Sequence, residues 1–479
     1  MGVQKKNPLS LLNESQLKDD LILTNGLEYK LFLSQGDSFG NNLNFGSDND
    51  FIAHQKISET QSIFLFNHES PLQGYPAFEQ QKQVGVSLIV CQKGLDNSWT
   101  PIKEHPLNRR IDGTTEIPFS NNIKIKNKNS AIGTLANCAG GKTPWGTFLT
   151  CEENFHAFYT AYDFSNKTSQ YSWELMSPYP SEHYGWVVEI NPLTGQAQKH
   201  TSLGRFCHEG ATVTRAKNGM PVVYMGDDSN DQFIYKFISN KKDSLEDGEL
   251  FVADTVHGKW LSLDINKQPQ LQKSFSSQID LLIQTRKAAL LLGATPQDRP
   301  EDIEVHPETQ DVYISLTNNF DKARPFGAIL KIKEKNSDAA SLEFEAETFV
   351  SGGADSTFAC PDNLCFDRKG NLWMTNDISE NKLGVGEFKK FPRNGLYYIP
   401  LSGPNAGQAE LMAYAPPDAE LTGPCFAPDH SCLFLSVQHP GIASNTEKIT
   451  SHWPKGGNEK ALSSVVTISG PRFQELLQT

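Results

Sequence analysis

The sequence predicts an all-β protein in which one small sheet is repeated six times. Short segments rich in Val, Ile, Phe, Tyr and Trp are separated by turns of Gly, Asn, Asp and Pro. Six places share one design, a turn, a short apolar strand and then polar or acidic residues: 62–69, 145–154, 222–228, 312–319, 372–377 and 433–439. The copies start about 60 to 90 residues apart, which fits a four-stranded repeat with long insertions. We therefore expect a six-bladed β-propeller with loop and short helical insertions.

Four of these copies are preceded by a sister strand that itself opens on an acidic residue: 209–213, 301–307, 362–367 and 420–429. The turns between sister strands carry hairpin residues, as in Asp-Arg-Lys-Gly-Asn at 367–371. Because the blades of a propeller surround one axis, we expect the acids at the strand ends to converge on one axial pocket.

The repeat also sets the domain organisation. A length of 479 residues would by itself indicate about three domains. Since the repeat runs nearly from end to end, we expect an N-terminal extension over residues 1–24 and a single propeller over 25–479. The clearest helical pattern, 277–292, ends at Gly293 and predicts a helical insertion that caps the pocket.

Composition excludes several classes of partner. The net charge is −13, and no cluster of Lys and Arg is present, which argues against nucleic-acid binding. No apolar run approaches the ~18 residues of a membrane span. The N-terminus has neither an apolar signal segment nor a twin-arginine motif. We expect a chain that is cytosolic, exported by another route or freed of its signal, so the compartment stays open.

Residues 133–155 contain several candidate metal ligands close together in the sequence. Cys138 sits in a glycine-rich turn, and a short strand from Gly146 then ends on Glu152 and Glu153. A soft thiolate and hard carboxylates together suit a site that holds more than one kind of metal. The alternative is a solvated turn with an inert buried cysteine.

The other cysteines point away from structural zinc, because none of the eight forms a Cys-x-x-Cys pair. Cys365, Cys425 and Cys432 fall within strand-like segments, where cysteine usually packs as a small hydrophobe. Cys207 is the second candidate ligand. A catalytic triad of Cys207 with the His and Glu that follow it is geometrically poor, because adjacent strand residues face opposite ways.

Several motifs resemble those of the PhoX-type alkaline phosphatases. They cover roughly residues 25–445 and occur in order: 108–115, 137–155, 184–192, 203–211, 223–228, 298–301, 305–307 and 438–441. The resemblance implies a six-bladed propeller with a pair of ferric irons (Fe3+) and several calcium ions (Ca2+) joined by a bridging oxo group. It also implies a monomer that hydrolyses small phosphate monoesters, usually after twin-arginine export.

The resemblance assigns roles to individual residues. Cys138 would be the thiolate ligand of an iron, and Glu209 and Asp228 would be carboxylate ligands of the iron–calcium core. Arg299 would grip the phosphate oxygens as a fixed fork, with Glu301 beside it as the second catalytic residue. The acids that would bind or bridge calcium are Glu152, Glu153, Glu301, Asp377 and Glu420.

Three positions depart from the family pattern. Ile442 stands where an acid often follows Gln-His-Pro-Gly, Cys207 precedes the His-Glu-Gly motif, and Gln35 replaces the tryptophan of Trp-Gly-Asp. All three bear on substrate range rather than on the metal core.

The expected mechanism is metal-assisted hydrolysis, in which a metal-bound or bridging oxygen attacks phosphorus in line. One alternative is another calcium-dependent propeller hydrolase, of lactonase or phosphotriesterase type. Cys138 counts against it, because calcium does not seek thiolates. The other alternative is a non-catalytic binding propeller, which has no need of crowded anions.

Overall fold

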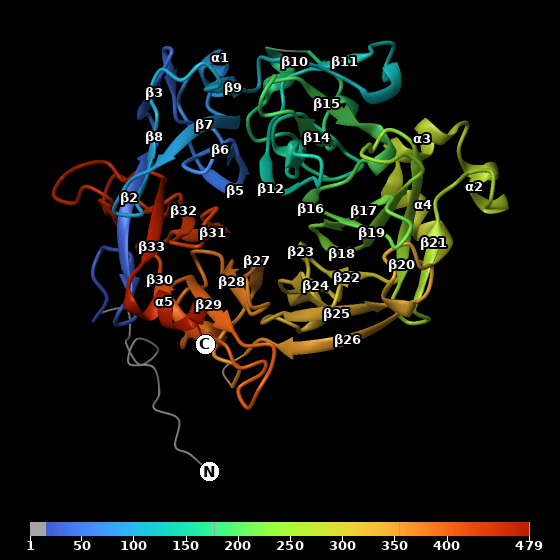
Figure 1. Cartoon of the computed structure of the whole chain (residues 1–479). Helices are drawn as coiled ribbons and strands as arrows, with labels where there is room; N and C mark the ends of the chain where they lie inside the picture. Colours follow the sequence, from blue (N-terminus) through green and yellow to red (C-terminus); the bar gives the residue numbers. More distant parts are fainter. Residues whose placement is uncertain (1–15, 177, 354, 479) are drawn as a thin grey trace.

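Six antiparallel sheets surround one central axis in the computed structural model, which describes residues 16–176, 178–353 and 355–478 (Figure 1). The chain runs once around the ring, and strand β2 near its N-terminal end lies beside the last strand, β33. The fold is the predicted six-bladed β-propeller, mostly β with a few short helices.

Blades 1 to 3 each place their first strand at the axis and their later strands further outward. Blade 1 contains β5 (Asn49–Lys56), β6 (Gln61–His68), β7 (Gly85–Lys93) and β8 (Trp99–Pro101), with β9 (Arg109–Ile111) also on β7. Blade 2 contains β12 (Asn137–Lys142), β13 (Phe148–Glu152), β14 (Val187–Ile190) and β15 (Ala197–His200). Blade 3 contains β16 (His208–Arg215), β17 (Pro221–Asp227), β19 (Ile234–Ser239), β20 (Gly248–Asp254) and β21 (Lys259–Ser262).

The remaining blades have the same order from the axis outward. Blade 4 contains β23 (Pro300–Val305), β24 (Val312–Leu316), β25 (Ala328–Glu334) and β26 (Phe344–Ser351). Blade 5 contains β27 (Pro361–Phe366), β28 (Leu372–Asn376), β29 (Gly395–Ile399), β30 (Glu410–Tyr414) and β1 (Ile22–Leu23). Blade 6 contains β31 (Glu420–Phe426), β32 (Leu433–Gln438), β33 (Ser464–Ser469) and β2 (Glu28–Ser34). In the described part of the chain, three small strand pairs lie outside the blades: β3 (Ser38–Gly40) with β4 (Leu43–Asn44), β10 (Glu116–Pro118) with β11 (Ser130–Ile132), and β18 (Asn230–Gln232) with β22 (Gln297–Asp298).

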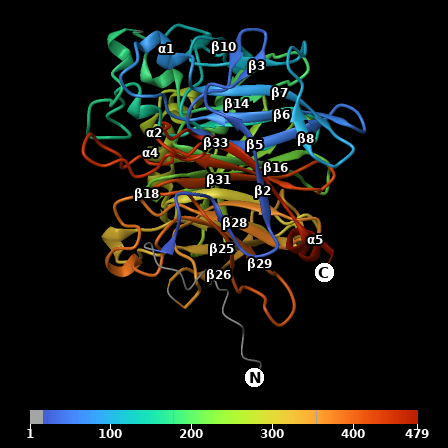
Figure 2. The same ribbon diagram turned by 90° about the vertical axis from the view of Figure 1, so that its left-hand side faces the viewer.

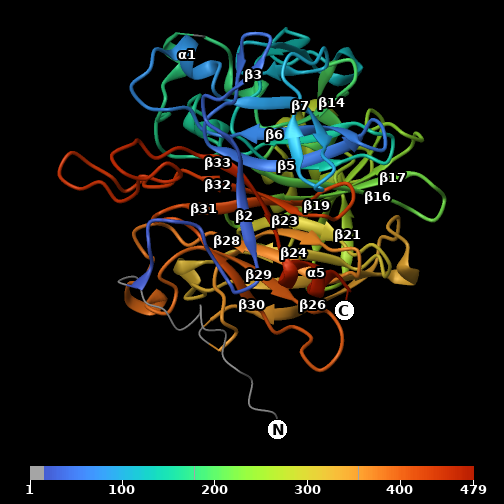
Figure 3. The same cartoon turned by 60° about the vertical axis from the view of Figure 1, so that its left-hand side comes forward.

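The ring is closed by pairing the two ends of the chain. Strand β2 adds to β33 in antiparallel register, with Glu28 opposite Ser469, and completes blade 6 (Figures 2 and 3). The pairing protects an edge that would otherwise be open. Residues 1–15 of the expected N-terminal extension lie outside the described residues. Strand β1, in the described part of the extension, pairs with β30 and so forms the outer edge of blade 5.

The predicted helical insertion is present, but as two short helices rather than one. Helix α3 (Gln278–Ile283) and helix α4 (Thr285–Leu292) meet at Gln284, whose φ of −109° and ψ of 40° interrupt the helical path. The Ser277 side chain caps α3, and Gly293 ends α4 with a φ of 73°. The short helix α2 (Pro269–Ser274) precedes them, and their apolar faces pack into the core between blades 2 and 3.

The other α-helices are α1 (Ala77–Gln81), in the loop between β6 and β7, and α5 (Pro471–Gln478), at the C-terminus. Within the part of the chain that the structure describes, no helix has the length and apolar character needed to cross a membrane.

Candidate metal centre

The innermost strand of each blade lies at the central axis (Figure 1). Each of these strands carries an ionisable or thiol residue of the axial cavity at its first or second position. These residues are Asp50, Cys138, Glu209, Glu301, Asp362 and Glu420. All six inner strands also carry a shift of pairing register near this end. A bulge bends the strand and re-aims its side chains, so it directs these groups toward the axis.

The residue before the inner strand often has a left-handed backbone conformation. Asp48, Ala136, Arg299 and Cys360 have φ values of 50°, 51°, 53° and 51°. This conformation is unfavourable for a residue with a Cβ and persists only where the surroundings impose it. Its recurrence in four blades shows that one local geometry delivers the axial side chains.

A second set of side chains comes from the loops that follow the next strands outward. Together the two sets line a cavity of about 120 Å³ on the axis. Its lining residues are Asp50, Glu69, Cys138, Glu153, Asn154, Glu209, Asp228, Arg299, Glu301, Asp362, Asp377, Glu420 and Gln438. Nine of them are acids and, among the described residues of this wall, only Arg299 is basic.

Three overlapping groups of side chains bring their ligand atoms within 4.8 Å of one another. The groups are Asp50–Glu69–Cys138, Cys138–Glu153–Glu209 and Glu209–Glu301–Asp362. Cys138 and Glu209 each belong to two groups, so the three candidate positions form a continuous row. The Cys138 sulfur lies 3.1 Å from Asp50 Oδ2 and 3.1 Å from Glu209 Oε1, and a single thiol hydrogen can satisfy only one of them.

The pKa values of several cavity acids are raised, because burial and mutual repulsion make their ionised forms unfavourable without a cation. Burial, together with neighbouring acids, raises the pKa of Asp50 to about 6 and that of Glu69 to about 8. Burial and neighbouring acids also raise the pKa values of Glu209 and Glu301 well above their ordinary value. The buried Asp50 Oδ1 has no hydrogen-bond partner among the described residues. Buried carboxylates of this kind require protons, cationic side chains or metal ions.

Arg299 is held in the cavity by three acids. Its Nε and Nη2 donate to the two oxygens of Asp228 at 2.9 and 2.8 Å. Nη2 also lies 2.6 Å from Glu301 Oε1, and Nη1 lies 3.4 Å from Asp377 Oδ2. The bidentate contact with Asp228 fixes the plane of the guanidinium, and Nη1 has the loosest contact.

The structure brings together all but one of the site residues predicted from the sequence. Those on the cavity wall are Cys138, Glu153, Glu209, Asp228, Arg299, Glu301, Asp377 and Glu420. Glu152 is the exception, because it ends β13 and points to the opposite face from Glu153. Its carboxylate accepts from Lys199 Nζ at 2.6 Å and from the amides of Gly185 and Trp186, all fully buried.

Five lining residues are absent from the set predicted from the sequence: Asp50, Glu69, Asn154, Asp362 and Gln438. Glu69, Asp362 and Gln438 lie within the strand segments of the sequence repeat, so the repeat itself carried the signal for them. Asp50 follows a polar run, Ser-Asp-Asn at 47–49, in which no pattern singles it out.

The departures from the family pattern lie off the cavity wall. Cys207 is fully buried, with its sulfur 3.9 Å from His156 Nδ1, and Ile442 is exposed. Residues 277–292, expected to cap the pocket, do not line it either.

Glu152 and Glu153 offer a matched test of which acids belong to the metal cavity. Glu152→Gln leaves Lys199 charged, buried and without its counter-ion, so we expect the free energy of unfolding to fall by about 3–5 kcal/mol. Bound metal should be unchanged in the folded protein. Glu153→Gln should instead lower the metal content with a smaller loss of stability. Thermal unfolding and elemental analysis of both variants measure this, and metal loss in Glu152→Gln would contradict the assignment.

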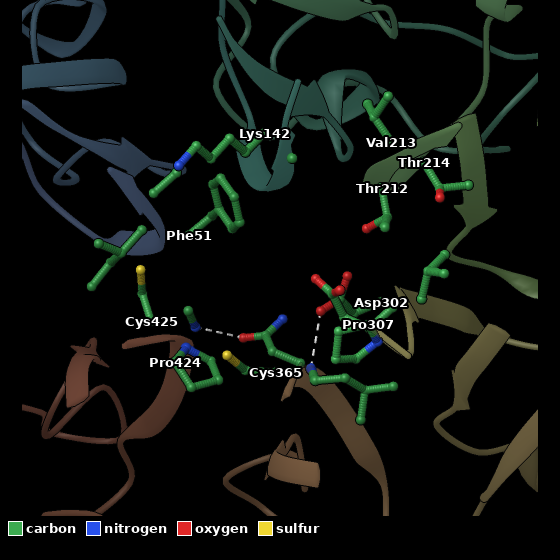
Figure 4. Close-up of a pocket in the computed structure, with 18 of the residues that line it drawn as sticks. Phe51, Lys142, Thr212, Val213, Thr214, Asp302, Pro307, Cys365, Pro424 and Cys425 are labelled. Atoms are coloured by element: carbon green, nitrogen blue, oxygen red, sulfur yellow. Dashed lines mark hydrogen bonds between the residues drawn. The ribbon is translucent and has the colours of Figure 1, made fainter. Parts of the chain in front are cut away.

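A second cavity, of about 370 Å³, lies further along the same inner strands (Figure 4). Side chains that line this cavity join the inner strands of neighbouring blades. Asp302 Oδ2 accepts a hydrogen bond from the Leu364 amide at 2.9 Å, and Asn363 Oδ1 accepts one from the Gly423 amide at 2.7 Å. Cys365 and Cys425 line this cavity and also pack, half-buried, against apolar clusters, as the sequence predicted. Cys432 is buried in the core as expected.

Comparisons with known proteins agree with this geometry. The family model described as "Alkaline phosphatase PhoX" matches residues 11–441. The structure of Pseudomonas fluorescens PhoX in complex with vanadate, a transition state analogue, is similar, with 27% identity over 95% of this chain and 97% of that one and a TM-score of 0.83. A protein of unknown function from Dyadobacter fermentans shares 9% identity over 93% of this chain and 100% of that one, with a TM-score of 0.44. No curated protein matches the chain. Because the family model spans most of the sequence and the P. fluorescens fold superposes over nearly the whole length, the chain belongs to the PhoX family of alkaline phosphatases.

Proposed function

We propose that this phosphoric monoester hydrolase acts at a centre of Fe3+ and Ca2+ held by the axial acids and Cys138. The observation that carries the proposal is the row of three overlapping ligand groups beside Arg299 in one cavity. Nine buried or half-buried acids facing a single arginine require further positive charge. The donor set fits such a group of cations.

The donor chemistry divides the cations between the three groups. We assign iron to the two groups that contain Cys138, because a thiolate is a soft ligand and calcium does not seek one. We assign calcium to the all-oxygen group of Glu209, Glu301 and Asp362, with Asp377 and Glu420 as further oxygen ligands on the same wall. When bound, these cations supply charge neutralisation at the phosphoryl oxygens and Lewis-acid activation of the nucleophile.

The chain's own residues orient the phosphate. Arg299 presents a planar fork of donors, and Asp228 fixes that plane through two hydrogen bonds. Among the described residues Nη1 contacts just Asp377, at 3.4 Å, so Nη1 is the nitrogen best placed to turn to a substrate oxygen. Glu301 Oε1 lies 2.6 Å from Nη2 of the same guanidinium and helps to hold it in place.

The Cys138 thiol is poorly suited to be a nucleophile. Burial, Asp50 and Glu209 all raise its pKa, so without a cation it stays protonated. This favours the role of metal ligand. The site also draws one side chain from each of the six blades of a single chain, which supports a monomer as the active unit.

Turnover of a chromogenic phosphate monoester tests this proposal. Enzyme supplied with iron and calcium should hydrolyse the monoester at alkaline pH much faster than a phosphotriester or a lactone of similar leaving group. Faster turnover of the triester or the lactone would instead support the other propeller hydrolases. An absence of turnover with all three substrates would support a binding propeller.

A further inference from the structure

A buried ion pair between Asp227 and Arg286 adjoins Asp228, the residue that holds Arg299. The Asp227 carboxylate is fully buried and receives Arg286 Nε on Oδ2 at 2.8 Å and Arg286 Nη2 on Oδ1 at 2.5 Å. The Cys207 amide donates to the same Oδ1 at 3.2 Å. This is a two-point guanidinium–carboxylate contact, the geometry in which arginine cannot be replaced by lysine.

The position of Asp227 connects this pair to the phosphate-binding arginine. Asp227 ends β17 and Asp228 is the next residue, so the two side chains face opposite ways, one toward the ion pair and one toward the cavity. The Asp228 amide donates to the Cys207 carbonyl at 3.0 Å. Both residues are therefore tied to Cys207, just before the inner strand that carries Glu209. Asp228 in turn holds two nitrogens of Arg299.

Arg286 is itself firmly placed, although it does not line the cavity. It sits in the first turn of α4, within the helical insertion. Nη2 also donates to Ser229 Oγ at 2.9 Å, and the guanidinium lies 4.4 Å from the ring centroid of Phe164. Phe164 comes from the long loop after β13 in blade 2, so Arg286 joins the insertion, blade 3 and a loop of blade 2.

We propose that Arg286 is a positioning residue for phosphate binding, which acts through Asp227 to hold Asp228 and hence the plane of Arg299. The helical insertion thereby contributes to the site without contacting the substrate. This inference rests on the proposed function, in which Arg299 binds the phosphoryl oxygens. Removing a residue that orients a binding side chain without contacting the ligand typically lowers affinity or activity by about 10- to 100-fold.

The test uses paired variants that leave no buried charge alone. Asp227→Asn with Arg286→Gln removes the positioning pair. Lys236→Met with Glu334→Gln removes a control pair that is also buried, has a 3.0 Å contact and lies off the cavity wall. Both double variants should unfold at a lower temperature than the wild type. Only the first should weaken the binding of inorganic phosphate, measured by isothermal titration calorimetry on the metal-loaded protein, by about tenfold or more.

Arg286→Lys keeps the charge and provides a second measurement should the double variant fail to fold. It should weaken phosphate binding in the same direction, because a single ammonium cannot make both contacts. Wild-type phosphate affinity in Arg286→Lys or in the double variant would overturn the positioning role while leaving the proposed function intact. A wild-type protein that binds no phosphate and hydrolyses no monoester would overturn the proposed function, and this inference with it.

Discussion

Replacing Cys138 with alanine is expected to remove iron from the protein and to lower kcat/KM by at least about a hundredfold. Cys138 belongs to two of the three ligand groups, and its sulfur lies 3.1 Å from an acid of each group. Its loss therefore opens two adjacent cation positions at once and removes the only soft donor in the row. Elemental analysis, the visible absorption of a thiolate–iron bond and monoester turnover measure the three consequences together.

Cys432→Ala is the matched control. Cys432 is a buried cysteine in the apolar cluster between blades 1 and 6, and it lies off the metal cavity. This variant should retain iron, colour and turnover, with only the modest loss of stability that follows removal of a small buried group. Unchanged iron content in Cys138→Ala would refute the assignment of this thiol as a ligand.

The sequence repeat predicted the fold because each blade is a local unit with its own strands and turns. The six repeat segments correspond to the second strands of the six blades, and the sister strands to four of the inner ones. Ring closure was not predicted. Strand β2 pairs with β33 across nearly the whole chain, and no periodicity within either strand indicates that contact. The break at Gln284 was missed because the apolar residues continue on both sides of it.

The sequence predicted some residues of the cavity wall correctly and missed or misplaced others. Acids at strand ends could be predicted because the repeat marks those ends. The prediction for Glu152 is wrong because adjacent strand residues face opposite ways, and its buried partner Lys199 is 47 residues away in the sequence. The role of Arg286 could not be predicted either, because its contact with Asp227 depends on how the insertion folds back onto blade 3.

Removing cations is expected to lower both stability and activity, more strongly as the pH rises. The pKa values of Asp50 and Glu69, about 6 and about 8, lie above those of exposed acids. A group whose folded pKa is raised contributes stability below its unfolded pKa and loses it as the pH rises through its folded pKa. The cation-free protein should therefore lose stability between about pH 4 and pH 8, where these acids are forced to ionise in the cavity.

Bound cations replace those protons and should oppose the loss. A cation that binds only the folded state adds about 2.7 kcal/mol per site at a hundredfold excess over its dissociation constant. The difference in melting temperature between the calcium-loaded and the chelated protein should therefore grow from pH 5 to pH 8. Magnesium should substitute poorly, because it demands strict octahedral geometry.

The proposed function requires cations held by the axial acids and Cys138, and one paired measurement tests for them. Thermal unfolding and monoester turnover are recorded on the same sample before chelation, after chelation and after calcium is restored, at pH 8. We expect melting temperature and turnover to fall together on chelation, and calcium to restore both more fully than magnesium. If chelation leaves melting temperature and turnover unchanged, the axial acids do not form a cation site and the proposed mechanism is wrong.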